Sequence, residues 1–171
     1  VVKMQDDLHL IGEGMIEFKT YPALDKKPKN IITIEENAEF GLYQITAASM
    51  SRYPTVKSQM LEKQKDYCEY QVAIDYGSQA NDVFLRFEYW GDQAELYLDG
   101  EKVADHYYTG EAMEVSMRRF GFPQKLRFKI FPLKADAKIY LEHWPSMDNN
   151  EVCHLNKIDL RREFDHILCF S

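Results

Sequence analysis

Strict alternation of apolar and polar residues is the sequence feature that most limits what this chain can fold into. The alternation runs through Val83–Trp90, Ala94–Asp99 and Lys125–Phe131. Successive side chains of a β-strand point to opposite faces, so each segment predicts a strand with one buried and one exposed face. Because antiparallel sheets commonly expose one face to water, the pattern also indicates antiparallel pairing.

Weaker alternation predicts further strands, and glycine-containing turns separate them. Asp99-Gly100 is a strong hairpin signal because a type I′ turn needs positive φ at both central residues, and Gly91-Asp92 is expected to join another hairpin. The weaker candidate strands are Met15–Lys19, Phe40–Thr46, Cys68–Ile74, Ala112–Met117, Ala137–Glu142 and the region Val152–Leu160.

Many short strands at this spacing are typical of a β-sandwich or jelly roll. A chain of 171 residues with 45% hydrophobic residues is long enough for one substantial core. We therefore predict a single all-β sandwich domain over residues 1–171. Residues 49–66 lack alternation and are expected to form a long loop or a short helical insertion. At the C-terminus, the apolar residues between Leu160 and Leu168 fit either a strand or a helix.

Charge and composition exclude several classes of function. The net charge of −7 argues against binding to nucleic acid or to an anionic membrane surface. No apolar run of about 18 residues exists, so no membrane span is expected. The scattered Cys68, Cys153 and Cys169 define no disulfide framework; reduced thiols are favoured, and one disulfide stays open. Since the chain starts at Val1, we expect a processed or truncated piece.

Sequence motifs for catalysis or metal binding are absent. The patterns HExxH, GxSxG, the P-loop and GxGxxG do not occur, and the five histidines are dispersed. The segment Ser146–Glu151 gathers oxygen donors, but it lacks EF-hand spacing, so a polar turn is favoured over a structural calcium ion. No catalytic residue, metal or other cofactor is predicted.

Aromatic residues near expected strand ends carry the remaining functional signal. Trp90 and the Tyr107-Tyr108 pair could form a flat platform for sugar rings. Trp144, on an expected loop before Pro145, and the polar Asp92 are the further candidate carbohydrate-binding residues. Packing in the core explains most aromatic residues of β-domains, and we weigh it ahead of binding. Asp92 is also explained as a turn residue, since its side chain can bond to the backbone.

The run from Asp82 to Glu142 resembles the C-terminal β-sandwich module of bacterial β-galactosidases of glycoside hydrolase family 35 and their relatives. The resemblance is carried by Leu85-Arg86, Gly91-Asp92, Ala94, Leu96-Tyr97, Asp99-Gly100, Val103-Ala104-Asp105, Tyr108, Gly110, Arg119-Phe120, Phe131-Pro132-Leu133, Ala137, Ile139 and Tyr140. It covers about a third of the chain. The family's Asn-Phe-Tyr-Asn-Gly reads His106–Gly110 here, and residues 49–66 have no clear counterpart.

The resemblance implies a galactose-binding-like jelly roll that is not itself catalytic. In such proteins the catalytic glutamates lie on a separate (β/α)₈ barrel, and no position of this chain matches those motifs. The expected function is that of an accessory, carbohydrate-binding-like module of an exported bacterial protein, partnered by a glycan or by a catalytic domain. A stand-alone glycoside hydrolase or lyase and a protein-interaction domain are the alternatives.

Overall fold

A computed structural model describes residues 2–4, 7–45, 52–78 and 80–168 of the chain. Backbone contacts divide it into two compact units. Unit 1 comprises Val1–Ser51, Gln79–Val83 and Arg162–Ser171, and unit 2 comprises Arg52–Ser78 and Phe84–Arg161. The sequence predicted one domain over residues 1–171, whereas the contacts gather in these two units, and each unit is described by itself below.

The described residues are nearly all β-structure, which confirms the predicted fold class. The strand pairs β1–β2, β2–β15, β3–β5, β4–β5, β6–β7, β7–β12, β9–β12, β9–β10, β8–β11 and β13–β14 are antiparallel. The one short helix in the described ranges is the 3₁₀ turn η1 (Arg118–Phe120). Within the same ranges, no helix has the length and hydropathy needed to span a bilayer.

Unit 1 holds a three-stranded sheet in the order β3-β5-β4 and a second set of pairs in which β2 joins β1 and the end of β15. Its small core consists of Leu10, Ile45 and Leu168, with Ile16, Phe18 and Ile31 packed around them. The strands are β1 (Val2–Met4), β2 (Asp7–Gly12), β3 (Ile16–Thr20), β4 (Ile31–Glu36), β5 (Gly41–Ile45) and, from Arg162 onward, the end of β15 (His154–Leu168), whose first part belongs to unit 2.

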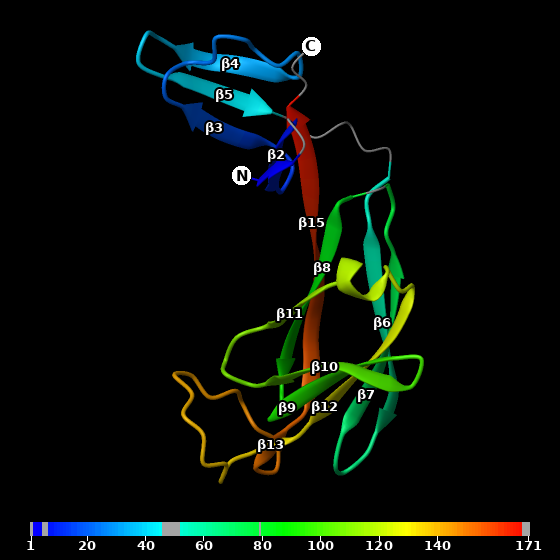
Figure 1. Cartoon of the computed structure of the whole chain (residues 1–171). Helices are drawn as coiled ribbons and strands as arrows, with labels where there is room; N and C mark the ends of the chain where they lie inside the picture. Colours follow the sequence, from blue (N-terminus) through cyan, green and yellow to red (C-terminus); the bar gives the residue numbers. More distant parts are fainter. Residues whose placement is uncertain (1, 5–6, 46–51, 79, 169–171) are drawn as a thin grey trace. The chain divides into compact units, whose positions relative to one another are not determined.

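Unit 2 is built from two layers of strands (Figure 1). One layer has the order β10-β9-β12-β7-β6, and the other contains β8 paired with β11. The bounds are β6 (Thr55–Lys63), β7 (Cys68–Asp75), β8 (Asp82–Trp90), β9 (Gln93–Leu98), β10 (Glu101–Tyr107), β11 (Met113–Ser116), β12 (Lys125–Phe131), β13 (Leu133–Lys134) and β14 (Glu151–Val152).

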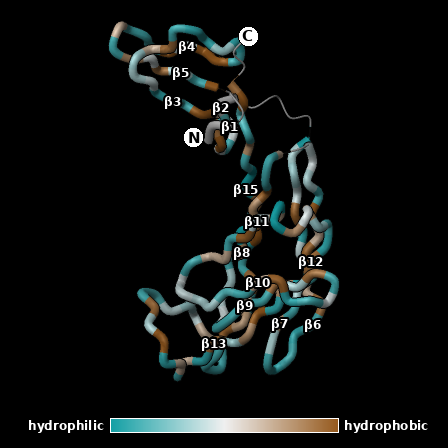
Figure 2. Tube along the Cα trace, in the orientation of Figure 1, coloured by the Kyte–Doolittle hydropathy of each residue, from teal (hydrophilic) through white to brown (hydrophobic). Residues whose placement is uncertain are grey.

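The core of unit 2 lies between these layers and consists of the residues that alternation predicted to face inward. Phe87 of β8 stacks on Phe128 of β12, with ring centroids 4.2 Å apart and planes inclined by 16°, and Tyr89 meets the same ring edge-on at 5.8 Å. Figure 2 shows hydrophobic residues interspersed with hydrophilic ones along the strands. Fully burying one such side chain contributes about 1.5–3 kcal/mol, so the periodic rows supply much of the stability.

Of the two predicted hairpins, the structure contains one. Asp99 and Gly100 have φ of 50° and 87° and connect β9 to β10, as expected (Figure 1). Gly91 does not close a hairpin, because β8 pairs with β11 whereas β9 pairs with β10 and β12. The chain instead crosses between the layers there. A Cβ at Gly91 would lie 2.4 Å from Ile130 Cγ2, so glycine is required by close packing.

Among the weaker predictions, the strands expected near residues 15–19, 40–46, 68–74 and 112–117 are present as β3, β5, β7 and β11. The region Val152–Leu160 holds the end of β14 and the start of β15, and the C-terminal alternatives resolve to a strand, because β15 extends to Leu168.

Two expectations were wrong. Residues 55–63 form strand β6 instead of a loop or helix, while residues 49–51 lie outside the described chain. As an edge strand with mostly exposed side chains, β6 needs no alternation. Ala137–Glu142 is not a strand, and Leu141 is its buried residue.

Candidate functional site

Trp90 is placed by the alternation of β8. Leu85, Phe87 and Tyr89 face the core, so Trp90, the last residue of the strand, points to the other face and is half-buried. The strand stops there because the next residue, Gly91, leads the chain into the other layer. A large indole ring is therefore held at the end of a rigid element.

Tyr108 is fixed next to this strand end by a backbone hydrogen bond and a ring contact. Its amide donates to the Asp92 carbonyl at 2.9 Å, and its ring centroid lies 5.4 Å from that of buried Tyr89. Burial raises the pKa of Tyr108, and the nearby carboxylate of Glu111 raises it further. The position of Tyr108 is thus set by the same turn that ends β8.

Trp144 comes from the segment between β13 and β14. These two short strands pair antiparallel, with Leu133 opposite Val152, and the Ala135 amide donates to the Asn150 carbonyl at 2.8 Å. Leu133 and Leu141 are buried and tie the segment to the unit. Trp144 remains 43% exposed, which is unusual for an indole ring that contributes to a core.

These three aromatic residues line one hollow of about 300 Å³, which we name the Trp90–Trp144 hollow. That volume is at the lower end for small-molecule sites. The complete lining is Trp90, Tyr108, Thr109, Gly110, Glu111, Glu142, His143, Trp144 and Pro145. All of these residues belong to unit 2.

Two further predicted site residues lie elsewhere. Tyr107, the last residue of β10, is 68% exposed and is not part of the lining. Asp92 is exposed and also outside the lining, and its amide donates to the Phe131 carbonyl at 2.8 Å. A role for either residue in binding stays a prediction.

Sequence reasoning missed the polar residues of the hollow. Glu111, Glu142 and His143 join it only because the loop after β10 and the β13–β14 segment fold toward the same strand end. No spacing or motif links Glu111 to Glu142, so no local signal could have paired them. The Gly110 that precedes Glu111, at φ 95°, was the nearest hint of an exposed turn.

Two neighbouring hollows share Trp90 and differ in charge. One, of about 150 Å³, contains Arg86, whose guanidinium donates to Glu88 at 2.7 Å. The other, of about 330 Å³, mixes Lys63 and Lys65 with acidic and polar residues of the β13–β14 turn. The lysines thus balance the acidic residues of the larger hollow, whereas the smaller one holds Arg86 and two carboxylates, Glu88 and Glu111.

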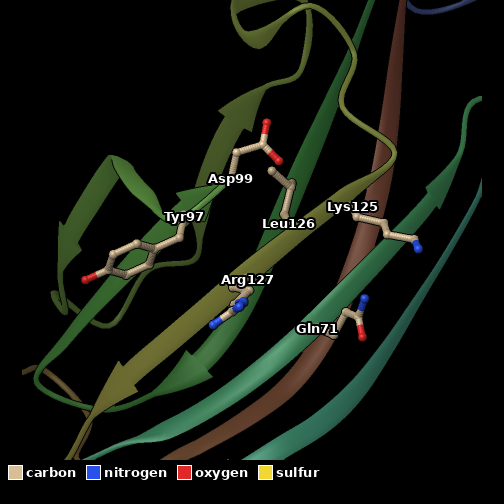
Figure 3. A pocket seen from close by; sticks show the side chains of 7 residues that line it. Gln71, Tyr97, Asp99, Lys125, Leu126 and Arg127 are labelled. Carbon is tan, nitrogen blue, oxygen red and sulfur yellow. The ribbon is translucent and has the colours of Figure 1, made fainter.

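A fourth hollow, of about 290 Å³, lies on the outward face of the five-stranded layer (Figure 3). Gln71, Arg127 and Tyr97 form a row across β7, β12 and β9, because Arg127 is in register with both of the others. The Tyr97 hydroxyl donates to Glu95 at 2.5 Å, and Arg127 lies 3.7 Å from Glu69. These cross-strand pairs explain the residues as sheet stabilisation, and one aromatic ring is a weaker platform than three.

The oxygen-rich segment that raised the question of calcium forms a tight turn. Asp148 and Glu151 exchange two backbone hydrogen bonds of 3.1 Å, and Asn149 and Asn150 both have positive φ. Across the described part of the chain, no three His, Cys, Asp or Glu side chains come together in a way that could hold a metal ion.

Comparison with known proteins adds no relative: no family model, no curated protein and no solved structure matches this chain.

Proposed function

We propose that unit 2 is a non-catalytic, carbohydrate-binding-like module that takes a glycan in the Trp90–Trp144 hollow. The single observation that carries the proposal is the convergence of Trp90, Tyr108 and Trp144 on one hollow from three separate segments of the chain. Flat aromatic rings bind the C–H face of a sugar ring, and polar groups beside them fix its hydroxyl groups. Here Thr109 and His143 supply such groups.

The wider context of the module belongs to the same proposal. The resemblance of Asp82–Glu142 to the C-terminal module of bacterial β-galactosidases supports an accessory role beside a glycoside hydrolase domain in an exported protein. A (β/α)₈ hydrolase encoded in the same reading frame would support this context, and a cytosolic location of the native protein would contradict it.

Hydrolysis by this unit is the second candidate, because Glu111, Glu142 and His143 line the same hollow as the aromatic rings. Retaining glycosidases use two carboxyl groups about 5 Å apart. Chromatography of a bound oligosaccharide after long incubation separates the candidates: an intact ligand indicates a binding module, and cleavage products that disappear in Glu111→Gln indicate an enzyme.

Binding itself is tested by a glycan array followed by titration calorimetry on the glycans retained. Trp144→Ala should weaken binding by roughly tenfold, equal to ~1.4 kcal/mol, because it removes one stacking face. Tyr140→Ala is the matched control, since Tyr140 is 90% exposed on the same segment but outside the lining. Retention of no glycan, or equal effects of the two variants, would overturn the proposal.

A further inference from the structure

The Trp90–Trp144 hollow is acidic as well as aromatic. Glu111 and Glu142 contribute two carboxylates, and no lysine or arginine is part of the lining. Among the residues that the structure describes, neither carboxylate has a hydrogen-bond or ion-pair partner. Other carboxylates of unit 2 are paired with basic groups, as Glu114 is with Arg161 at 2.8 Å and Asp159 is with Lys157 at 2.8 Å. The hollow therefore carries uncompensated negative charge.

The charge excess is larger in this hollow than in its two neighbours. The smaller adjoining hollow shares Glu111 but also contains Arg86, which pairs with Glu88. On the other side of Trp90, Lys63 and Lys65 balance the acidic residues. A ligand that binds between Trp90 and Trp144 thus meets two carboxylates and three ring faces, and His143 is the one basic side chain of the lining.

An ammonium group fits these surroundings better than a neutral or anionic group does. The faces of tryptophan and tyrosine rings carry partial negative charge and attract cations, and hydrogen bonds from a cation to a carboxylate are among the strongest in proteins. The net charge of −7 also favours the approach of a positively charged ligand.

We infer that the Trp90–Trp144 hollow selects a glycan with a free, protonated amino group, that is, an amino sugar, over the neutral N-acetylated form. This inference rests on the proposed function, because it names the class of sugar that the same hollow takes. The rings hold the sugar face, and Glu111 and Glu142 accept hydrogen bonds from its ammonium group.

The test is titration calorimetry of the 171-residue chain with three probes near neutral pH. The probes are a fully deacetylated glucosamine oligosaccharide, its N-acetylated counterpart of the same length, and choline. We expect the deacetylated oligosaccharide to bind roughly tenfold more tightly than the N-acetylated one. Added salt should reduce this difference, because the screening length shrinks to about 3 Å at 1 M.

Carboxylate-to-amide variants identify the residues responsible. The double variant Glu111→Gln, Glu142→Gln should lower the affinity for the deacetylated probe by roughly tenfold and leave the N-acetylated probe unaffected. Glu101→Gln is the control, since it changes the net charge by one unit at an exposed position of β10 outside the hollow. Circular dichroism of each variant verifies that the β-structure is retained.

The outcomes separate this inference from the function on which it rests. If both oligosaccharides bind equally tightly and the double variant has no effect, the amino-sugar preference is overturned and glycan binding remains in place. Choline bound as tightly as the amino sugar, with the same variant effect, supports a cation site and overturns glycan binding. No heat from any probe overturns the amino-sugar preference, and the glycan array then decides whether the hollow binds any other glycan.

Discussion

At the scale of single residues, Gly91 is required by close packing. Instead of joining the expected hairpin, the residue connects two strands that do not pair with each other. An added Cβ would lie 2.4 Å from Ile130 Cγ2 and 2.7 Å from the Phe131 carbonyl oxygen. The second of these atoms belongs to the backbone of a central strand and has little freedom to move.

We therefore expect Gly91→Ala to lower the free energy of unfolding by about 1–3 kcal/mol through overpacking. Gly100→Ala is the control, because nothing lies within 4 Å of its added Cβ and only the φ of 87° is unfavourable. That change should cost about 1 kcal/mol or less. Urea unfolding followed by tryptophan fluorescence measures both, and a Gly91→Ala protein at least as stable as Gly100→Ala would contradict the packing argument.

The two described cysteines should react slowly in the folded protein. Cys68 is fully buried and donates to the Cys153 carbonyl at 3.3 Å, and the Cys153 thiol donates to the Ile130 carbonyl at 3.2 Å. Burial raises the pKa of Cys153, which reduces the reactive thiolate at neutral pH.

In a Cys169→Ser background, we expect a disulfide reagent such as dithionitrobenzoate to modify these thiols far more slowly in buffer than in denaturant. Absorbance of the released thiolate gives both rates. Rapid modification of the folded protein at neutral pH would show that the thiols are accessible and ionised.

At the scale of elements, the position of a strand within its sheet decides how its residues contribute. β9 pairs on both sides with β10 and β12, and its Leu96 is fully buried. β6 pairs on one side only, with β7, and its Leu61 is 47% exposed. Sequence patterns identify central strands more readily, because only they require a continuous apolar face.

A matched pair of substitutions tests this difference. Leu96→Ala should lower the free energy of unfolding by about 2–5 kcal/mol because it leaves a cavity in the core. Leu61→Ala, the same chemical change on the edge strand, should cost less than about 1 kcal/mol. Denaturant titrations give both values, and comparable losses would show that β6 is covered in solution.

At the scale of the whole molecule, each unit contains a histidine shielded from solvent: His166 of unit 1 is buried and His106 of unit 2 is half-buried. Burial lowers the pKa of His166 in unit 1 and of His106 in unit 2. His106 Nδ1 lies 2.9 Å from the hydroxyl of buried Tyr89, and His166 is 5% exposed. Each histidine binds a proton more readily in the unfolded chain, where its pKa is about 6.5.

The free energy of unfolding should therefore fall as the pH drops below about 6.5, because the histidines then bind protons in the unfolded chain but not in the folded one. The fall should end once the pH is below the lower pKa of the folded state. Both tryptophans, Trp90 and Trp144, belong to unit 2, so fluorescence reports that unit while circular dichroism reports both. His106→Gln should flatten the pH dependence seen by fluorescence, and His166→Gln should flatten only the part seen by circular dichroism. Urea midpoints that do not change between pH 7.5 and 5.5 would contradict this expectation.

Local order in this protein was determined by the sequence itself. Alternation predicted three strands and their buried faces, in Val83–Trp90, Ala94–Asp99 and Lys125–Phe131. The pair Asp99-Gly100 predicted a hairpin. Both features could be read from the sequence because the geometry of a strand or a turn depends on neighbouring residues. Three of the proposed binding residues, Trp90, Tyr108 and Trp144, were also recognisable from their places near expected strand ends.

The tertiary structure alone decided which strands pair and which side chains meet. Gly91 crosses between layers, β6 is an edge strand, and Glu111 and Glu142 join the aromatic rings, although none of these facts has a local signature. The physical reason is that strand pairing and hollows bring together residues distant in the chain. The alternation of a strand and the conformation of a turn depend on only a few neighbouring residues. The residues that line the hollow beside Trp90 are instead brought there by the packing of the whole unit.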